Sequence, residues 1–190
     1  VNQNNIKRLL AYSSINHMGF ILIGVLTGNE IGIKSVQLYI SIYMVSILGI
    51  FTSLLCLKDK INGHYLENIK NFSGLAKQNS FLSFSFAILL FSLAGLPPLS
   101  GFFAKLYILI SAVESKLYFL AIIAIITSII SAYYYLKIIK IIFFDKPINN
   151  IYINIPIFSK LIILITLFIS IFLIIFLSDL LEIITTVALV

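Results

Sequence analysis

The sequence is short of charge, of cysteine and of tryptophan. Charged residues make up 11% of its 190 residues, against roughly 25% in a typical soluble domain. So little polar surface excludes an ordinary soluble domain. The single cysteine, Cys56, excludes an internal disulfide and a CxxC metal site. Tryptophan is absent, isoleucine is abundant, and asparagine and lysine fill the loops, a bias typical of AT-rich genomes such as organellar ones.

Signatures of nucleotide, metal and nucleic-acid sites are also missing. The chain has no P-loop, no GxGxxG opening a helix and no HExxH, and His17 and His64 are far apart in the sequence. Its net charge of +6 comes from basic residues in short loops between apolar runs, which favours membrane topology over nucleic-acid binding. We therefore expect no cofactor, no metal and no nucleic-acid partner.

Hydrophobic residues make up 61% of the chain, and the mean hydropathy is +1.11. A helix needs roughly 20 apolar residues to cross the hydrocarbon core of a membrane. The pattern predicts an all-α, polytopic membrane helix bundle in one domain over residues 1–190, with about five transmembrane helices. The expected segments are 6–26, 35–57, 81–112, 117–142 and 160–177. The last is apolar on all sides, so we expect it to lie mostly in lipid.

The third segment is too long for one straight crossing. At 1.5 Å per residue it would reach roughly 48 Å, against a core of about 30 Å. It contains Pro97, Pro98 and Gly101, and two adjacent prolines remove backbone donors and disrupt the preceding turn. We expect the helix to break at Pro97-Pro98 and to restart near Phe102. Irregular backbone at this depth survives only inside protein or beside a water-filled cavity, so the break should face the interior.

The loop charges predict an orientation. With the start of the first segment inside, the outside ends hold only Lys34 and Lys116 as basic residues. The inside ends hold Lys7, Arg8, Lys58, Lys60, Lys70, Lys77, Lys137, Lys140, Lys146 and Lys160. This positive-inside bias predicts an inside N-terminus and, after five crossings, an outside C-terminus.

Lys105 is the only charged residue between Lys77 and Glu114. Burial disfavours the charged form of a lysine, which makes proton exchange easier, and ionisable residues inside membranes are usually functional. The alternative is snorkelling, in which the ammonium group stretches to the membrane interface. Glu114 lies roughly 13 Å further along a helix, beyond the reach of the lysine side chain.

Polar residues also fall on the faces of three segments. Ser13, Ser14 and His17 share one face of the first, and His17 could relay protons or form an ordinary interhelical hydrogen bond. Two further stripes could pack helices together or line a hydrated path beside Lys105. They consist of Tyr39, Tyr43, Ser46 and Ser53, and of Thr127, Ser131, Tyr134 and Tyr135.

Two long motifs carry a family resemblance. Residues 5–20, NIKRLLAYSSINHMGF, resemble the start of the tenth helix of the antiporter-like subunits of respiratory complex I. Residues 92–105, SLAGLPPLSGFFAK, resemble their broken twelfth helix, and residues 128–137 resemble the thirteenth. The sequence is therefore similar to helices ten to fourteen of this family. Within it, Lys105, Tyr43 and the LPPL run at 96–99 resemble the subunit 2 type.

The resemblance implies a membrane-arm subunit of a proton-translocating NADH:ubiquinone oxidoreductase, with no redox chemistry in this chain. It implies that Lys105 carries protons in the outward half-channel and that His17 belongs to a hydrated central axis. The path-lining candidates are Ser13, Ser14, Tyr43, Ser46, Thr127 and Ser131. The family's charged residues on helices five, seven and eight have no counterpart here, so we expect another polypeptide to supply those helices.

Expected partners are lipid and other membrane-arm subunits of complex I. The expected location is the mitochondrial inner membrane, with the N-terminus in the matrix and the C-terminus in the intermembrane space. A bacterial or plastid energy-transducing membrane is the alternative. Two other functions stay open: a structural membrane-arm fragment that does not pump, and a subunit of a cation/proton antiporter or membrane-bound hydrogenase.

Overall fold

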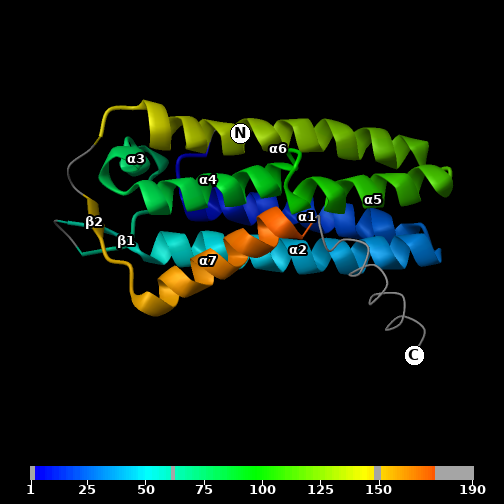
Figure 1. Cartoon of the computed structure of the whole chain (residues 1–190). Helices are drawn as coiled ribbons and strands as arrows, with labels where there is room; N and C mark the ends of the chain where they lie inside the picture. Colours follow the sequence, from blue (N-terminus) through cyan, green and yellow to red (C-terminus); the bar gives the residue numbers. More distant parts are fainter. Residues whose placement is uncertain (1–2, 61–62, 148–150, 174–190) are drawn as a thin grey trace.

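The structure is a computed structural model that describes residues 3–60, 63–147 and 151–173. Within these residues seven α-helices follow in chain order: α1 Ile6–Leu26, α2 Glu30–Leu55, α3 Leu75–Gln78, α4 Ser80–Ala94, α5 Ser100–Glu114, α6 Tyr118–Phe144 and α7 Ile157–Phe172. The longer helices run side by side (Figure 1). Helix α2 packs against α1, α4, α5 and α7, and α6 covers α4 and α5. The predicted helical bundle is confirmed.

Three helices, α1, α2 and α6, are long and apolar enough to cross a membrane. Helices α4 and α7 are apolar but shorter, with 15 and 16 residues, so the expected number of five crossings is not confirmed. The boundaries also differ from expectation. Helix α2 begins at Glu30 and not at Ser35, because Asn29 caps its first turn by accepting from Gly32 N at 2.7 Å. The expected end of the last helix at Leu177 lies outside the described residues.

Helix α7 buries one narrow face against the bundle and leaves most of its side chains exposed, so the expectation that it lies mostly in lipid stays a prediction. Its buried residues are Ile163, Thr166 and Ser170, and it packs against α2 and α4. Gly49 of α2 allows this close approach, because a Cβ there would lie 2.5 Å from Thr166 Oγ1. Phe168 and other large apolar residues on the opposite side are exposed. Two of the three buried residues, Thr166 and Ser170, are small hydroxyl residues of the kind that let membrane helices pack closely.

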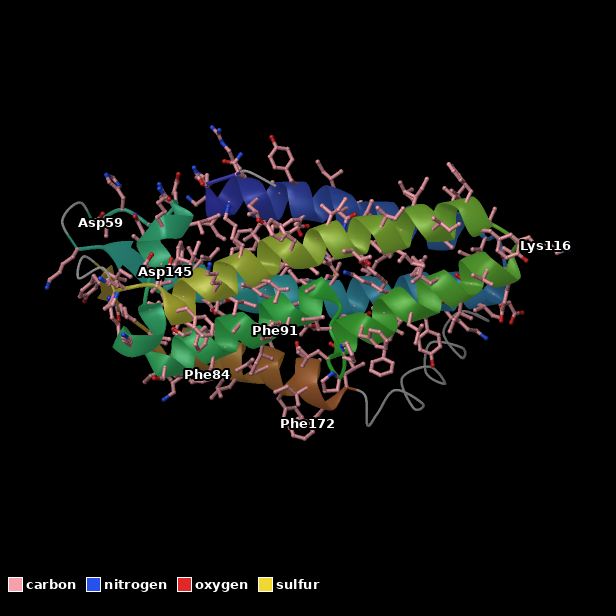
Figure 2. All side chains as sticks on the ribbon, turned by 90° about the horizontal axis from the view of Figure 1, so that it is seen from above. Asp59, Phe84, Phe91, Lys116, Asp145 and Phe172 are labelled. Atoms are coloured by element: carbon pink, nitrogen blue, oxygen red, sulfur yellow. The ribbon has the colours of Figure 1, made fainter. Side chains whose placement is uncertain are left out.

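One end of the bundle is closed by the segment between α2 and α4. It contains β1 (Leu57–Asp59), which pairs antiparallel with β2 (Ile151–Ile153), and the 3-10 helix η1 (Ile69–Phe72). Phe72 and Leu75 are fully buried, so this segment between two apolar helices carries an apolar underside. Lys7 pairs with Glu67 at 2.7 Å and ties the loop to α1. Asp59 and Asp145 lie at this end and Lys116 at the other (Figure 2).

The interior contains two apolar clusters with polar side chains between them. The first includes Leu10, Phe86 and Leu93, and the second includes Phe20 and Ile42. Tyr43 packs against both clusters. The buried polar residues beside this boundary come from four helices, and they are Ser13, His17, Ser46, Ser92, Ser100 and Lys105. Lys105 and His17, the two main candidates of the sequence, therefore both lie at this boundary between the clusters.

Candidate functional site in the helix break

The break between α4 and α5 brings Lys105 against the end of α4. Gly95 ends that helix in the left-handed conformation, with φ at +81°, which a glycine adopts without steric cost. Lys105 Nζ donates a hydrogen bond of 2.8 Å to the carbonyl oxygen of Ala94, the last residue of α4. The final carbonyls of a helix lack intrahelical partners and carry partial negative charge. The lysine therefore caps the half-helix that precedes it.

Helix α4 caps α5 in return. Leu99 precedes α5 and offers no side-chain cap, but Ser92 Oγ accepts a hydrogen bond of 3.3 Å from Gly101 N. Gly101 permits this contact, because a Cβ there would collide with the backbone carbonyl group of Ser92. The two half-helices thus hold each other at the break. The observed restart at Ser100, earlier than the expected Phe102, is stabilised by this arrangement.

The ammonium group of Lys105 is shielded from solvent and has no carboxylate partner among the described ion pairs. The residue is 6% exposed, and the ion pairs found in the described residues are Lys7–Glu67 and Lys34–Glu30. Its Nζ lies 5.5 Å from the centre of the Phe20 ring, within range of a cation–π interaction. The charge is therefore balanced by the end of α4 and by an aromatic face. This burial argues against snorkelling within the chain.

Lys105 and His17 line the same small cavity. Its other lining residues are Tyr39, Ile42, Tyr43, Ser46, Ser92, Leu93 and Gly101. The cavity measures about 10 Å³, close to the roughly 10–15 Å³ that one buried water requires. It has polar partners on several sides. The cavity can therefore hold one water beside the ammonium group of Lys105 and the side chain of Tyr39.

His17 is held from two helices. Its Nδ1 is 2.8 Å from the hydroxyl of Tyr39 on α2, and its Nε2 is 3.1 Å from the hydroxyl of Tyr135 on α6. The Tyr135 hydroxyl also contacts Ser13 Oγ. A neutral imidazole donates from one nitrogen and accepts at the other, and a tyrosine hydroxyl can do either. This chain of hydroxyls can therefore accommodate either tautomer of His17.

The other expected path-lining residues separate into two groups. Ser14, Tyr43 and Ser46 lie at the site: Tyr43 donates to Ser14 Oγ at 2.8 Å, and Ser46 lies in the cavity wall. Thr127 and Ser131 do not line the Lys105 cavity, and they border pockets between α1 and α6. Their hydroxyls donate to backbone carbonyls of their own helix.

The helix break faces the interior only in part. Ser100 and Ala94 are buried, but both Pro97 and Pro98 are exposed on the described chain. The two proline rings are thus uncovered on this chain by itself, and the expectation that the break faces the protein interior stays a prediction for the assembled complex. Proline rings lack a donor and can lie outward at no hydrogen-bonding cost, while the capped carbonyl and amide groups turn inward.

Two residues of the site, Ser92 and Phe20, were not among the candidates predicted from the sequence. Tyr39 and Tyr135 were predicted as members of the polar stripes of their helices. Ser92 reaches Gly101 across an irregular break, which helical spacing cannot describe. Phe20 resembles any other core aromatic until the fold sets it beside Lys105. Within the described ranges, no group of three or more His, Cys, Asp or Glu side chains is placed to bind a metal.

Comparison with known proteins points to one family. Residues 1–131 match the family described as NADH:quinone oxidoreductase/Mrp antiporter, TM. NADH-quinone oxidoreductase subunit N of Pelagibacter ubique is 48% identical over 146 residues, which cover 77% of this chain and 31% of that protein. Subunit N 1 of Rhizobium meliloti is 47% identical over 147 residues, covering 77% and 30%. The chain thus spans about a third of the length of these relatives.

Solved structures give the same result. Respiratory complex I from Thermus thermophilus contains a chain that is 27% identical, with a TM-score of 0.81, over 95% of this chain and 40% of that one. The Mrp complex from Dietzia contains one that is 28% identical, with a TM-score of 0.69, over 77% and 27%. Because the relatives named here are bacterial, they support the bacterial membrane location and give no support to the mitochondrial one.

Proposed function

Since the chain belongs to the family of NADH:quinone oxidoreductase and Mrp antiporter membrane subunits, and is similar to subunit N, the homologue of the subunit 2 type, we propose that it carries part of a proton path. In this proposal it is a membrane-arm subunit of a proton-translocating NADH:quinone oxidoreductase. Lys105 is the residue that takes up and releases the proton. The redox chemistry belongs to other subunits.

The observation that supports this proposal best is the buried Lys105 at the helix break. An ammonium group at membrane depth is energetically costly, so such groups are rare and are usually paired or functional. Among the described residues, the contacts found for the ammonium group of Lys105 are those with the Ala94 carbonyl and the Phe20 ring. Both interactions favour the charged form of Lys105 moderately. Because neither partner is a carboxylate, loss of the proton does not leave an unpaired negative charge buried beside it. A lysine in this setting can alternate between charged and neutral states.

His17 is the second station of the proposed path. A water in the shared cavity would connect Lys105 Nζ to the hydroxyl of Tyr39, which contacts His17 Nδ1, and the hydroxyl of Tyr135 would continue the hydrogen-bonded chain from His17 Nε2 to α6. Ser13, Ser14, Tyr43 and Ser46 are proposed to line this path. Thr127 and Ser131 are proposed to serve the neighbouring surface between α1 and α6, since they border pockets there.

The proposed topology has five crossings, with α4 and α5 together making one. The basic ends gather at the end of the bundle where β1 pairs with β2, which supports an inside location for that end. We propose an energy-transducing membrane of the bacterial type. The relatives are about three times as long, so we also propose that this chain works with further helices, supplied by another polypeptide.

One alternative function is supported by a specific observation. The likeness to a chain of the Mrp complex from Dietzia suggests cation/proton antiport, for which a buried lysine would serve equally well. The higher identity to subunit N proteins favours the oxidoreductase. The partners that co-purify with the chain distinguish the two. A purely structural role is distinguished by substitution of Lys105.

The decisive experiment compares Lys105→Arg with Lys105→Met. Arginine keeps the positive charge and donates to the Ala94 carbonyl, but it does not release its proton. If proton exchange is the role of Lys105, both variants assemble and both lose NADH-driven proton pumping in membrane vesicles. If Lys105 only caps α4, Lys105→Arg pumps normally. Lys140→Met, at an exposed lysine of α6, is the matched control and should pump normally.

A further inference from the structure

Three buried serine hydroxyls form a row that begins in the Lys105 cavity. Ser46 of α2 and Ser92 of α4 line this cavity together with Lys105. Ser92 Oγ lies 3.4 Å from Ser46 Oγ and also 3.4 Å from the Oγ of Ser100, the first residue of α5. Ser100 is not among the lining residues of the cavity, so this serine row leads away from it toward the helix break.

The serine row differs from the other hydroxyl residues on the helices. Most of those donate to a carbonyl three or four residues earlier in their own helix, as Ser85 and Ser111 do. Within the described residues, no such bond holds a member of the serine row. The 3.4 Å separations exceed the usual O–H···O distance of about 2.7–2.8 Å, so these hydroxyls are within reach of one another without being fixed.

Ser92 keeps its hydroxyl proton available. A serine hydroxyl has one donor position and two acceptor positions. Gly101 N donates to Ser92 Oγ at 3.3 Å, which uses one acceptor position and leaves the proton free to point at Ser46 or Ser100. The other acceptor position can receive a hydrogen bond from a water in the cavity. Ser92 can therefore accept a proton from the cavity side and pass its own to Ser100.

Ser100 lies next to the exposed part of the break. Pro97 and Pro98 precede it by three and two residues, and both are exposed on this chain, whereas Ser100 is 2% exposed. Irregular backbone at membrane depth is tolerated only where it is buried in protein or lines a water-filled cavity. The serine row therefore ends beside a segment against which lipid alone is unfavourable.

We propose that Ser92 and Ser100 form a second branch of the proton path, which connects Lys105 to water at the helix break. Lys105 Nζ gives a proton to the cavity water, which passes one of its protons to Ser92 Oγ. The Ser92 hydroxyl passes its own proton to Ser100 Oγ, and the Ser100 hydroxyl gives its proton to water at the break. Lys105 is left neutral, and every hydroxyl keeps one hydrogen. This inference rests on the proposed function, because it requires Lys105 to exchange protons.

The test compares two buried serines of α5. Ser100→Ala removes the last hydroxyl of the serine row, and Ser111→Ala removes a hydroxyl that is equally buried but donates to its own helix. NADH-driven proton pumping is measured in membrane vesicles and divided by the amount of assembled complex. Ser100→Ala should pump roughly tenfold more slowly, since a positioned proton-transfer group contributes about a hundredfold or more and water in the vacated space restores part of this. Ser111→Ala should pump normally, and equal pumping by the two variants would overturn the proposal.

Two further measurements distinguish a proton relay from a structural role. Pumping by Ser100→Ala should slow more in heavy water than pumping by the wild type, because a proton transfer has become rate-limiting. Ser100→Thr keeps the hydroxyl and should restore most of the rate. A purely structural contribution would lower the melting temperature of the assembled complex and leave the isotope effect unchanged. An unchanged isotope effect in Ser100→Ala would therefore refute the proposal even if its pumping is slow.

A second matched pair lies on α4. Ser92→Ala removes the middle of the serine row, whereas Ser85→Ala removes a buried hydroxyl that donates to Phe81 O at 2.7 Å. Ser92→Ala should show the slow pumping and the larger isotope effect of Ser100→Ala, together with a lower melting temperature because Gly101 N loses its acceptor. Ser85→Ala should pump normally with the isotope effect of the wild type. A wild-type isotope effect in Ser92→Ala would contradict the proposed branch.

The Lys105→Met variant separates this inference from the proposed function. If Lys105→Met stops pumping while Ser100→Ala pumps normally, the branch is refuted and the role of Lys105 stands. If Lys105→Met pumps normally, the proposed function fails and the branch fails with it. Loss of pumping in Lys105→Met, together with slow and isotope-sensitive pumping in Ser100→Ala, is the result expected from both.

Discussion

Lys105 Nζ and the carbonyl oxygen of Ala94 are 2.8 Å apart, and this contact joins α5 to the end of α4 across the helix break. The same break is closed in the other direction by Ser92 Oγ and Gly101 N. The candidate proton carrier is therefore part of the structure that holds the break together. Substitutions here affect both stability and function, so each needs a control that separates the two.

Gly95→Ala should disturb Lys105 directly. A Cβ at Gly95 would lie 2.8 Å from Lys105 Cδ and 3.1 Å from Nζ, and its φ of +81° disfavours alanine. We expect reduced proton pumping together with a stability loss of about 1–2 kcal/mol from the backbone conformation. Pumping in vesicles and the thermal stability of the assembled complex are the two measurements.

The control for Gly95→Ala is Gly28→Ala. Gly28 has a similar φ of +64°, but a Cβ there meets nothing within 4 Å. The Gly28→Ala variant should therefore lose about as much stability as Gly95→Ala but pump protons normally. Equal loss of pumping in both variants would show that backbone strain, and not displacement of Lys105, is responsible.

Gly101→Ala should separate α4 from α5. Its Cβ would collide with the backbone of Ser92, which cannot move aside as a side-chain tip can. Overpacking of this kind costs about 1–3 kcal/mol, which we expect as a lower melting temperature of the assembled complex. Gly19→Ala adds the same methyl group to an open helical position and should be neutral or stabilising by up to about 1 kcal/mol. Equal melting temperatures in the two variants would contradict the proposed close packing.

Much of this fold follows from sequence periodicity. The first helix occupies the expected residues 6–26, and the helix break occurs at the expected prolines, because proline acts locally. Lys105 and His17 were identified because charge and imidazole are rare in an apolar chain. Their placement in a common cavity was not predicted from the sequence.

Contacts between helices could not be predicted in the same way. Ser92 caps α5 only because Gly101 lets two backbones meet, and helical spacing does not extend across an irregular break. The hydroxyl stripe of α6 divides between two sites: Tyr135 contacts His17, whereas Thr127 borders a pocket between α1 and α6. Helix rotation decides which stripe members share a site, and that rotation depends on packing against neighbouring helices.

Tyr135→Phe should destabilise the site from the α6 side. The change removes the hydroxyl that contacts both His17 Nε2 and Ser13 Oγ, leaving buried polar atoms unpaired at a cost of about 1–3 kcal/mol. Because the relay from His17 toward α6 is also interrupted, proton pumping should fall. Tyr133→Phe, at a position that is 58% exposed, should change stability by less than about 0.5 kcal/mol. Pumping as fast as that of the wild type in Tyr135→Phe would exclude its hydroxyl from the path.

Glu67→Gln should reveal a pH-dependent attachment of the closing loop to α1. The hydrogen bond from Lys7, and next the one from Asn5, hold the pKa of the exposed Glu67 carboxyl below its usual range. A carboxyl whose pKa is lower in the folded state adds stability above its unfolded pKa. That stability disappears as the pH falls through the folded pKa. The wild type should therefore melt slightly higher than Glu67→Gln at neutral pH, and the difference should vanish in acid.

The difference in melting temperature between the wild type and Glu67→Gln should be small and sensitive to salt, since exposed ion pairs are weak and are screened by ions. Thermal unfolding of wild type and variant, measured across acidic and neutral pH at low and high salt, provides the measurement. Glu30→Gln removes the partner of Lys34 at the other end of the bundle and controls for the loss of one negative charge. A wild-type advantage that stays constant from neutral pH down to strong acid would exclude the Lys7–Glu67 pair as its source.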